Sequence, residues 1–327
     1  MLQKHDESKN IHHRLVSDEN KTIDSYSSEH RKGSRTLMCA VDGSVGSECA
    51  FRAMMSMRRK LDHVCIFHTY STEKDASCPS KFRNDEIREY YLQELTGTYN
   101  LPTTKFSFLW ENRKGRIVSE VIRDMLEGYK GIRNPMSPTQ QPPDIFICGF
   151  AGRRRSYDEG DANPLDIIVS GIGRTADFAV RNLFMPTIVV KFSASLEQTK
   201  RCIVVAVDGG EGSRKAYELA VSLLTGHDKL RVVTVDPADP EERPLVKSVD
   251  AIREEYEDSF AGVHVRDCSF ECIPCGDQRH VAETICEYAV YQQADFLCIA
   301  PRAEECLSSV TEYVLVHSHC SIILAKN

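Results

Sequence analysis

The sequence predicts an α/β protein made of two tandem, doubly wound domains, each with a five-stranded parallel sheet. Three observations predict this fold class. The chain has 327 residues, about twice the length of an ordinary domain. One segment recurs within it, and strand-like apolar runs alternate with helical patterns along most of its length. Hydrophobic residues make up 41% and charged residues 27%, which is typical of a globular chain.

The internal repeat sets the architecture. Residues 36–54 read TLMCAVDGSVGSECAFRAM, and residues 202–220 read CIVVAVDGGEGSRKAYELA. The two segments align without a gap, with Asp42 opposite Asp208. Each copy is an apolar run, then a glycine-rich turn, then apolar residues at helical spacing, so each predicts a strand, a turn and a helix.

The rest of each copy alternates in the same way. In the first copy, strands are predicted at Val64–Tyr70, Lys105–Trp110, Asp144–Cys148 and Thr187–Lys191, and helices at Asp85–Leu95, Ile117–Leu126 and Thr175–Leu183. In the second copy, strands are predicted at Leu230–Val235, Val263–Ile273, Phe296–Ala300 and Ser321–Ala325, and helices at Leu245–Phe260, Val281–Tyr291 and Val310–His317. Strands that are apolar on both faces and alternate with helices indicate a parallel sheet covered on both sides.

The domain boundaries follow from composition. Residues 1–35 are polar, with scattered apolar side chains, and are expected to form a disordered tail. Residues 36–192 form the first predicted domain, 193–200 a linker, and 201–327 the second domain.

Charge and hydropathy exclude several classes of protein. Lys plus Arg is 41 and Asp plus Glu is 48, a net charge of −7, so no generic nucleic-acid binder is expected. The sequence contains no apolar run of the ~18 residues that a membrane span needs, and no apolar secretory signal near residue 1. We therefore expect a cytoplasmic protein whose 13 cysteines are reduced, because most of them lie in apolar strand-like runs.

The two ends of the repeat resemble a known family. The opening AVDGS-x-x-S from Ala40 and the closing SSVTEYVLVHSHCSIILAK, Ser308 to Lys326, are similar to the universal stress protein family. The resemblance implies a strand order of 3-2-1-4-5 and a regulatory role in stress rather than catalysis. It also implies that the last strands pair two domains. We expect Thr187–Lys191 and Ser321–Ala325 to pair within the chain as a pseudo-dimer, because bare they would be exposed edges.

The resemblance further implies an ATP site in the first domain. Family members that bind ATP carry Gly-x2-Gly after strand 4 and Gly-Ser/Thr at the start of the last helix. Glycines allow close approach to phosphate, and a helix N-terminus favours an anion. Here the matching residues, with the end of the first strand placed against the adenosine, are Val41, Asp42, Gly149, Gly152, Gly173, Arg174 and Thr175. Any Mg²⁺ would accompany the ATP.

The two copies differ at this site. In the first, an insertion (residues 153–170) separates Gly152 from the next glycines, so the two halves must meet in space if it loops out. In the second, the strand ends in Ala300-Pro-Arg-Ala303, without either glycine. The sequence therefore predicts at most one adenine nucleotide per chain. The alternative function of Asp42 and Asp208 is to cap a turn or the next helix.

Other readings stay open. The chain could be a scaffold that binds other proteins but no nucleotide. It could also be a thiol redox or zinc protein that uses Cys272 and Cys275, with Cys268 and His280 as further ligands. The basic run Arg153–Arg155 could contact phosphate or form a solvated surface, and Ser156 beside it fits a basophilic kinase motif.

Overall fold

The computed structural model describes residues 33–72, 79–129, 142–152, 171–191, 200–236, 246–275, 280–301 and 307–326. Most of the predicted tail and linker therefore lies outside the described residues. So do residues 153–170, which include Arg153–Arg155 and Ser156.

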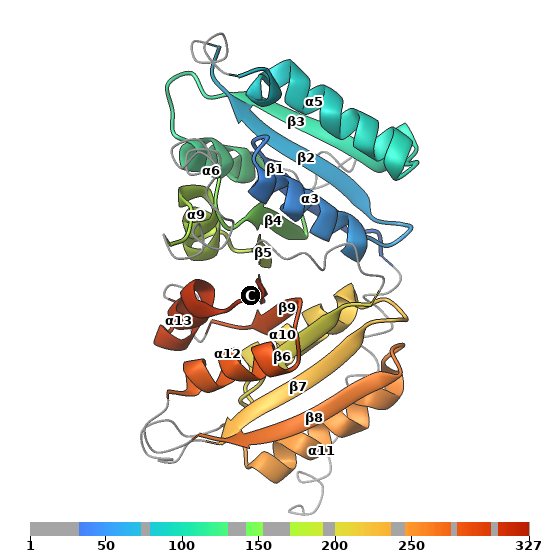
Figure 1. Cartoon of the computed structure of the whole chain (residues 1–327), viewed down its shortest axis with the longest axis vertical. Helices are drawn as coiled ribbons and strands as arrows, with labels where there is room; N and C mark the ends of the chain where they lie inside the picture. The colour runs from blue at the N-terminus through green and yellow to red at the C-terminus, as the bar shows by residue number, and fades with distance from the viewer. Residues whose placement is uncertain are drawn as a thin grey trace, which may run out of the picture.

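The described elements follow the predicted alternation (Figure 1). The first domain has strands β1 (Thr36–Val41), β2 (His63–Tyr70), β3 (Phe106–Asn112), β4 (Ile145–Gly149) and β5 (Thr187–Val190), and helices α3 (Val45–Met57), α5 (Asn84–Gln93), α6 (Val118–Tyr129) and α9 (Arg174–Asn182). The second has strands β6 (Cys202–Ala206), β7 (Lys229–Asp236), β8 (Asp267–Pro274), β9 (Phe296–Ile299) and β10 (Ser321–Leu324), and helices α10 (Glu211–Leu223), α11 (Val249–Ser259), α12 (Val281–Tyr291) and α13 (Ser309–His317).

Two predicted boundaries are wrong by four residues. The helix of the second domain that was expected from Leu245 begins at Val249, as α11, because Ser248 caps it. The third strand of the second domain was expected from Val263, but β8 begins at Asp267. A strand needs a hydrogen-bonded neighbour, and Asp267 is the residue that pairs with Lys229, the first residue of β7. Residues Phe260–Gly262 form a short 3-10 turn before it.

All ten strands form a single sheet in the order β3-β2-β1-β4-β5-β10-β9-β6-β7-β8. Each half has the strand order 3-2-1-4-5, which confirms the order that the resemblance implied. Within each half all neighbouring strands are parallel. Apolar side chains of α3, α5, α10 and α11 cover one face, and those of α6, α9, α12 and α13 cover the other. The ends of β1 and β4 therefore lie at the switch point of the first half, where such sheets bind ligands.

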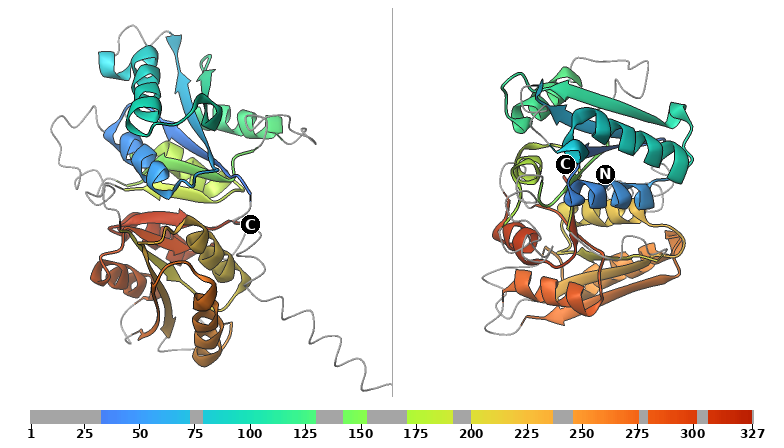
Figure 2. Two further views of the ribbon diagram at one scale, coloured as in Figure 1. Left: turned by 90° about the vertical axis from the view of Figure 1, so that its right-hand side faces the viewer. Right: turned by 45° about the horizontal axis from the view of Figure 1, so that its top comes forward.

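The two halves meet at β5 and β10, as predicted. These strands pair antiparallel, with Ile188 opposite Ile323. The registers of β4 with β5 and of β9 with β10 place Ile188 and Ile323 at equivalent positions of their domains. Equivalent residues that face one another indicate a pseudo-two-fold axis, with one domain on each side of it (Figure 2).

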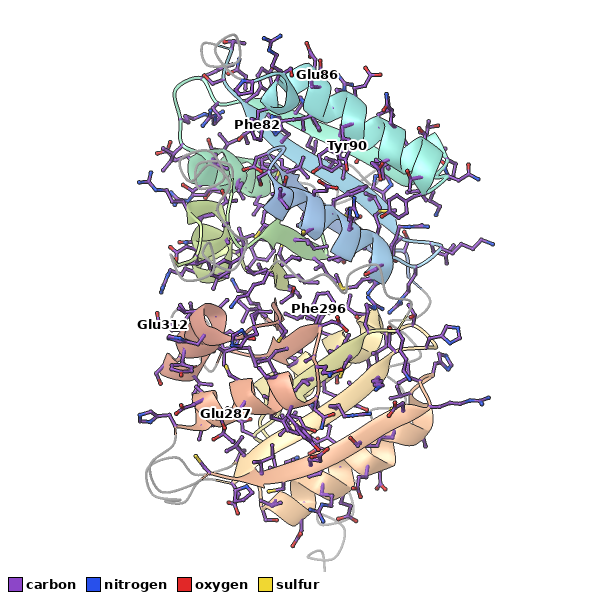
Figure 3. The ribbon with its side chains drawn as sticks, viewed as in Figure 1. Phe82, Glu86, Tyr90, Glu287, Phe296 and Glu312 are labelled. Carbon is purple, nitrogen blue, oxygen red and sulfur yellow. The ribbon has the colours of Figure 1, made fainter. Side chains whose placement is uncertain are left out.

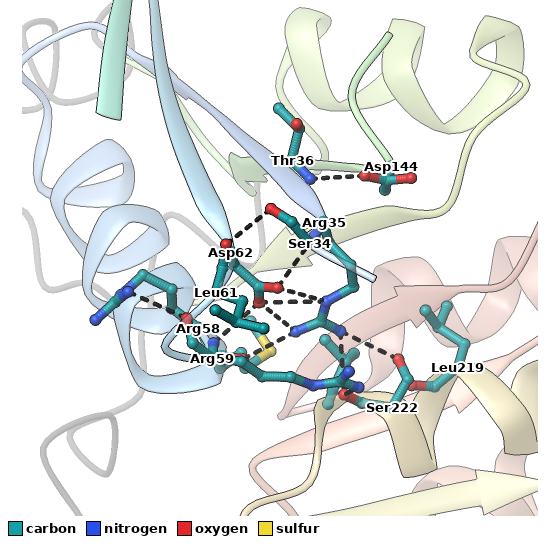
Figure 4. A network of polar contacts seen from close by, with 12 residues as sticks. Ser34, Arg35, Thr36, Arg58, Arg59, Leu61, Asp62, Asp144, Leu219 and Ser222 are labelled. Atoms are coloured by element: carbon teal, nitrogen blue, oxygen red, sulfur yellow. Dashed lines mark hydrogen bonds and ion pairs between the residues drawn. The ribbon is translucent and has the colours of Figure 1, made fainter. Parts of the chain in front are cut away.

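A reciprocal polar contact reinforces this pairing. Arg35 forms an ion pair with Asp62 (2.6 Å), and its Nη1 donates to the Ser222 carbonyl of the other domain (3.0 Å; Figure 4). At the equivalent place, Arg201 pairs with Asp228.

The second pair crosses the same boundary in the opposite direction, because Arg201 Nη1 donates to Ser56 Oγ on α3 (3.4 Å). Arg35 is therefore part of the folded domain, which corrects its assignment to the tail.

A surface contact joins the helices beside the axis. Arg181 on α9 reaches Glu312 on α13, with 2.9 Å between Nη1 and Oε1, and Figure 3 labels Glu312 on its helix. Both side chains are about half exposed, so this pair adds little stability.

Among the described helices, none has the length and apolar character needed to cross a membrane.

Candidate functional site

The turn after β1 is built around Asp42. Gly43 has a φ of 80°, a left-handed conformation that favours glycine. The Asp42 Oδ1 accepts hydrogen bonds from the Ser44 backbone N–H (3.1 Å) and from its hydroxyl (2.5 Å). Ser44 in turn caps α3 by accepting from the Ser47 N–H (3.2 Å). One oxygen of Asp42 thus has the turn-capping role that the sequence left open.

Gly149, at the end of β4, is required by packing. A Cβ at this position would lie 2.6 Å from the carbonyl carbon and oxygen of Gly46 in α3. Side-chain atoms do not approach backbone so closely, so only glycine lets α3 and β4 meet here. This requirement holds whether or not a ligand binds.

Gly152 lies against the second oxygen of Asp42. A Cβ at Gly152 would be 3.0 Å from Asp42 Oδ2. The glycine turn after β4 and the aspartate turn after β1 therefore come together at the switch point of the sheet. Two of the residues predicted from separate motifs are neighbours in space.

The start of α9 completes the cluster. Gly173 donates its backbone N–H to the Phe150 carbonyl (2.7 Å), and a Cβ on Gly173 would lie 3.4 Å from the Gly152 nitrogen. The chain therefore leaves at Gly152 and returns beside it, so the inserted residues do not separate the two halves of the motif in space. Arg174, which is exposed, and Thr175, which is half-buried, begin the helix.

The backbone at the start of α9 suits an anion. Gly173 occupies the N-cap position and has no side chain that could cap the first N–H groups of the helix. The first N–H groups of a helix carry partial positive charge and point outward along the helix axis at its N-terminus. A phosphate beside Gly152 and Gly173 would accept from them, while a carboxylate such as Asp42 accepts hydrogen bonds from hydroxyl groups.

Val41 has a hydrogen-bonding role within the chain. The side chain of Val41 is buried, and its carbonyl lies 2.7 Å from Nδ1 of His68 on β2. A carbonyl only accepts, so His68 donates from Nδ1. The Val41 carbonyl is thus already hydrogen-bonded within the chain. His68 is also buried, and no sequence motif marks it.

The second domain repeats the turn that follows the first strand of the domain. Gly209 has the same φ of 80°, and Asp208 Oδ1 accepts from the Gly210 N–H (3.0 Å). The segment before α11 covers this turn, because the Val246 N–H donates to the Asp208 carbonyl (3.1 Å) and a Cβ at Gly210 would lie 3.5 Å from Val246 Cγ2.

The last helix of the second domain is capped by its own chain. Ser308 Oγ accepts from the Thr311 N–H at the start of α13 (3.2 Å). The equivalent position in the first domain is Gly173, which has no side chain. Since residues 302–306 are not described, the comparison rests on Ala300, Pro301 and Ser308.

The cysteine motif does not assemble into a site. Cys268 and Cys272 lie on one face of β8, and Cys275 lies on the opposite side, buried against α12 with its Sγ 3.7 Å from Thr284 Oγ1. Burial raises the pKa of the Cys272 thiol, and nearby Asp236 raises it further, whereas a redox thiol needs a lowered pKa. In the described part of the chain, no group of three or more His, Cys, Asp or Glu could hold a metal ion.

Comparison with known proteins agrees with this fold. Residues 200–326 match the sequence model of the universal stress protein family. A universal stress protein from Archaeoglobus fulgidus superposes with a TM-score of 0.56 and 12% identity, covering 90% of this chain and 96% of that chain. A protein titled a putative universal stress protein from Pseudomonas aeruginosa gives 0.56 and 14% identity, covering 90% and 94%. No curated relative matches the sequence.

The fold is that of a tandem, doubly wound α/β protein with a shared ten-stranded sheet. Residues 200–326 are similar to the universal stress protein family, and the first half of the chain repeats the strand order of this second half.

Proposed function

We propose that this chain is a regulatory protein of the universal stress protein type that binds one adenine nucleotide, ATP, in its first domain. The observation that carries the proposal is the convergence of Asp42, Gly152 and Gly173 at the switch point of the first half of the sheet. Three segments that are far apart in the sequence supply these residues.

The residues suit the parts of a nucleotide. A phosphate beside Gly152 and Gly173 would accept from the Gly152 N–H and from the first N–H groups of α9, at Arg174 and Thr175, because the Gly173 N–H already donates to the Phe150 carbonyl. Two of these positions lack a Cβ, which leaves the backbone open to a ligand. Asp42 would accept hydrogen bonds from ribose hydroxyls, and ATP would bring any Mg²⁺ with it.

The proposal assigns the second domain a structural role. Proline at position 301 has no N–H to donate, and Ser308 already satisfies an N–H at the start of α13. The Val246 segment covers the Asp208 turn. Each of these features removes a place where phosphate or ribose would bind.

Titration calorimetry on the full chain tests the proposal. We expect ATP to bind with a stoichiometry of one, and Gly152→Val to abolish binding because the side chain would occupy the space beside Asp42 Oδ2. The matched control is Ala303→Val, at the position in the second copy that corresponds to Gly152, and it should bind as the wild type does. Equal loss in both variants, or binding that Gly152→Val leaves unchanged, would place the ligand elsewhere. Absence of binding by the wild type would favour the scaffold function.

A further inference from the structure

Two lysines, the buried Lys191 and the half-buried Lys326, cross between the domains. Lys191 follows β5, and its Nζ donates to the Ser318 carbonyl (2.5 Å) and the Val316 carbonyl (3.4 Å) at the end of α13. Lys326 follows β10, and its Nζ donates to two carbonyls at the end of α9. Each domain thus caps the last helix of the other with a cation.

The contact made by Lys326 reaches the helix of the candidate site. Its Nζ lies 2.8 Å from both the Ala179 and the Leu183 carbonyl oxygens. A cation at these carbonyls complements the helix dipole, and it joins the Leu183 N–H, which also donates to the Ala179 carbonyl (3.2 Å). The same helix begins at the N–H groups proposed to hold phosphate, about 14 Å away along a nine-residue axis.

Both ends of α9 are therefore fixed from outside the helix. The first end is held by the Gly173 N–H on the Phe150 carbonyl (2.7 Å), which is within the first domain. The other end is held by Lys326, which belongs to the second domain. Between them Ala176, Ala179 and Val180 are buried, so a shift of either end moves the helix as one body.

Lys191 touches the other half of the site. Its ammonium lies 4.8 Å from the ring centroid of Phe150, the residue that follows Gly149 in the glycine turn. Phe150 also donates its N–H to the Val190 carbonyl (2.8 Å). The cation–π contact and the bonds to α13 link this turn to the second domain.

We propose that Lys326 is a positioning residue of the nucleotide site, through which the second domain sets the nucleotide affinity of the first. This inference rests on the proposed function. The second domain, which has lost its own glycine turn, holds the helix whose N-terminus faces the phosphate. By linkage, a nucleotide bound at that N-terminus strengthens the pairing of the domains by the same factor.

The test compares two variants of the full chain. Lys326→Met keeps the length of the side chain and removes its ammonium. Ile323→Val trims the same interface at the centre of the β5–β10 pair without removing a cap. We expect the Kd for ATP to rise about tenfold in Lys326→Met and to change less than about twofold in Ile323→Val.

A second readout does not depend on nucleotide. In amide NMR spectra of the unliganded chain, Lys326→Met should shift the signals of Gly173 and Thr175 at the far end of α9, and Ile323→Val should leave them in place. Lys326→Gln, which keeps a hydrogen-bond donor without the charge, serves if the methionine variant does not fold. It is expected to weaken ATP binding by a smaller factor.

The outcomes separate the two proposals. If the wild type binds ATP and Lys326→Met binds equally well, the positioning role is wrong and the proposed function stands. Equal weakening by Lys326→Met and Ile323→Val would mean general loosening of the interface, which also overturns the role. If the wild type binds no ATP, the proposed function fails, and the inference fails with it.

Discussion

The ends of β4 and β9 occupy equivalent places in the two domains, but the first carries a glycine, Gly149, and the second an alanine, Ala300. In the first domain, Gly149 faces Gly46, and any side chain would collide with the α3 backbone. In the second domain, Ala300 faces Gly212 of α10. Because Gly212 has no side chain, the methyl group of Ala300 fits between the strand and the helix. In a glycine pattern that is typical of phosphate binding, individual glycines can therefore be required for different reasons. Gly149 is explained by packing against Gly46, whereas Gly152 borders on the Asp42 carboxylate.

The largest expected effect concerns the two equivalent ion pairs. Arg201→Met leaves the buried carboxylate of Asp228 without its cation and should cost about 3–5 kcal/mol of unfolding free energy. Arg35→Met should cost less, because the Arg35 side chain is 12% exposed and water can reach the site. Urea unfolding of both variants measures the difference. A larger loss of unfolding free energy in Arg35→Met than in Arg201→Met would contradict the explanation that the more deeply buried ion pair contributes more.

The next effect sharpens the glycine comparison. Gly149→Ala should cost about 2–3 kcal/mol, because its Cβ would lie 2.6 Å from the Gly46 backbone and α3 must move. Gly212→Ala, whose Cβ would meet Ala300 Cβ at 3.3 Å, should be nearly neutral, since alanine also favours the helix. Thermal or urea unfolding tests the pair. Equal losses would mean that the two domains pack alike at this point.

A smaller effect depends on pH. Burial lowers the pKa of Lys191 from its ordinary value near 10.5 to about 8. In the unfolded chain this lysine stays protonated up to a higher pH than in the folded one, so folding stability should rise as pH increases above 8. Relative to Lys191→Met, the wild type should gain about 1 kcal/mol between pH 7 and pH 9. Urea unfolding at both pH values checks this, and a difference that stays constant would show that the lysine is not perturbed.

The sequence predicted the architecture well for a physical reason. Strands buried on both faces leave continuous apolar runs, and the repeat that carries Asp42 and Asp208 marks two equivalent domains. The pairing of β5 with β10 was predicted because two short apolar strands end the copies. The start of β8 was missed, since the position of its partner strand, rather than hydropathy, determines where it begins.

The side-chain hydrogen bonds between the domains were not predicted, although the signal was present. Arg35, Ser56 and Asp62 recur as Arg201, Ser222 and Asp228 at the spacing that relates Asp42 to Asp208. Their partners lie in the opposite copy, so alignment of the copies alone does not show the bonds. Among the candidate site residues, the sequence selected Gly152 and Gly173 correctly as neighbours. It could not separate the packing role of Gly149 from a ligand role, because that depends on the distance to Gly46.

The two proposals give the domains different roles: the first domain binds the nucleotide, and the second holds the helix that begins at the nucleotide site. Native mass spectrometry of the full chain with increasing ATP tests this most directly, because it counts ligands per molecule. The account predicts one ATP adduct that saturates, with no second adduct at comparable ATP concentrations. Two adducts of similar affinity would show that the second domain has kept a site, and this result would contradict the asymmetry between Gly152 and the Ala300–Pro301 turn.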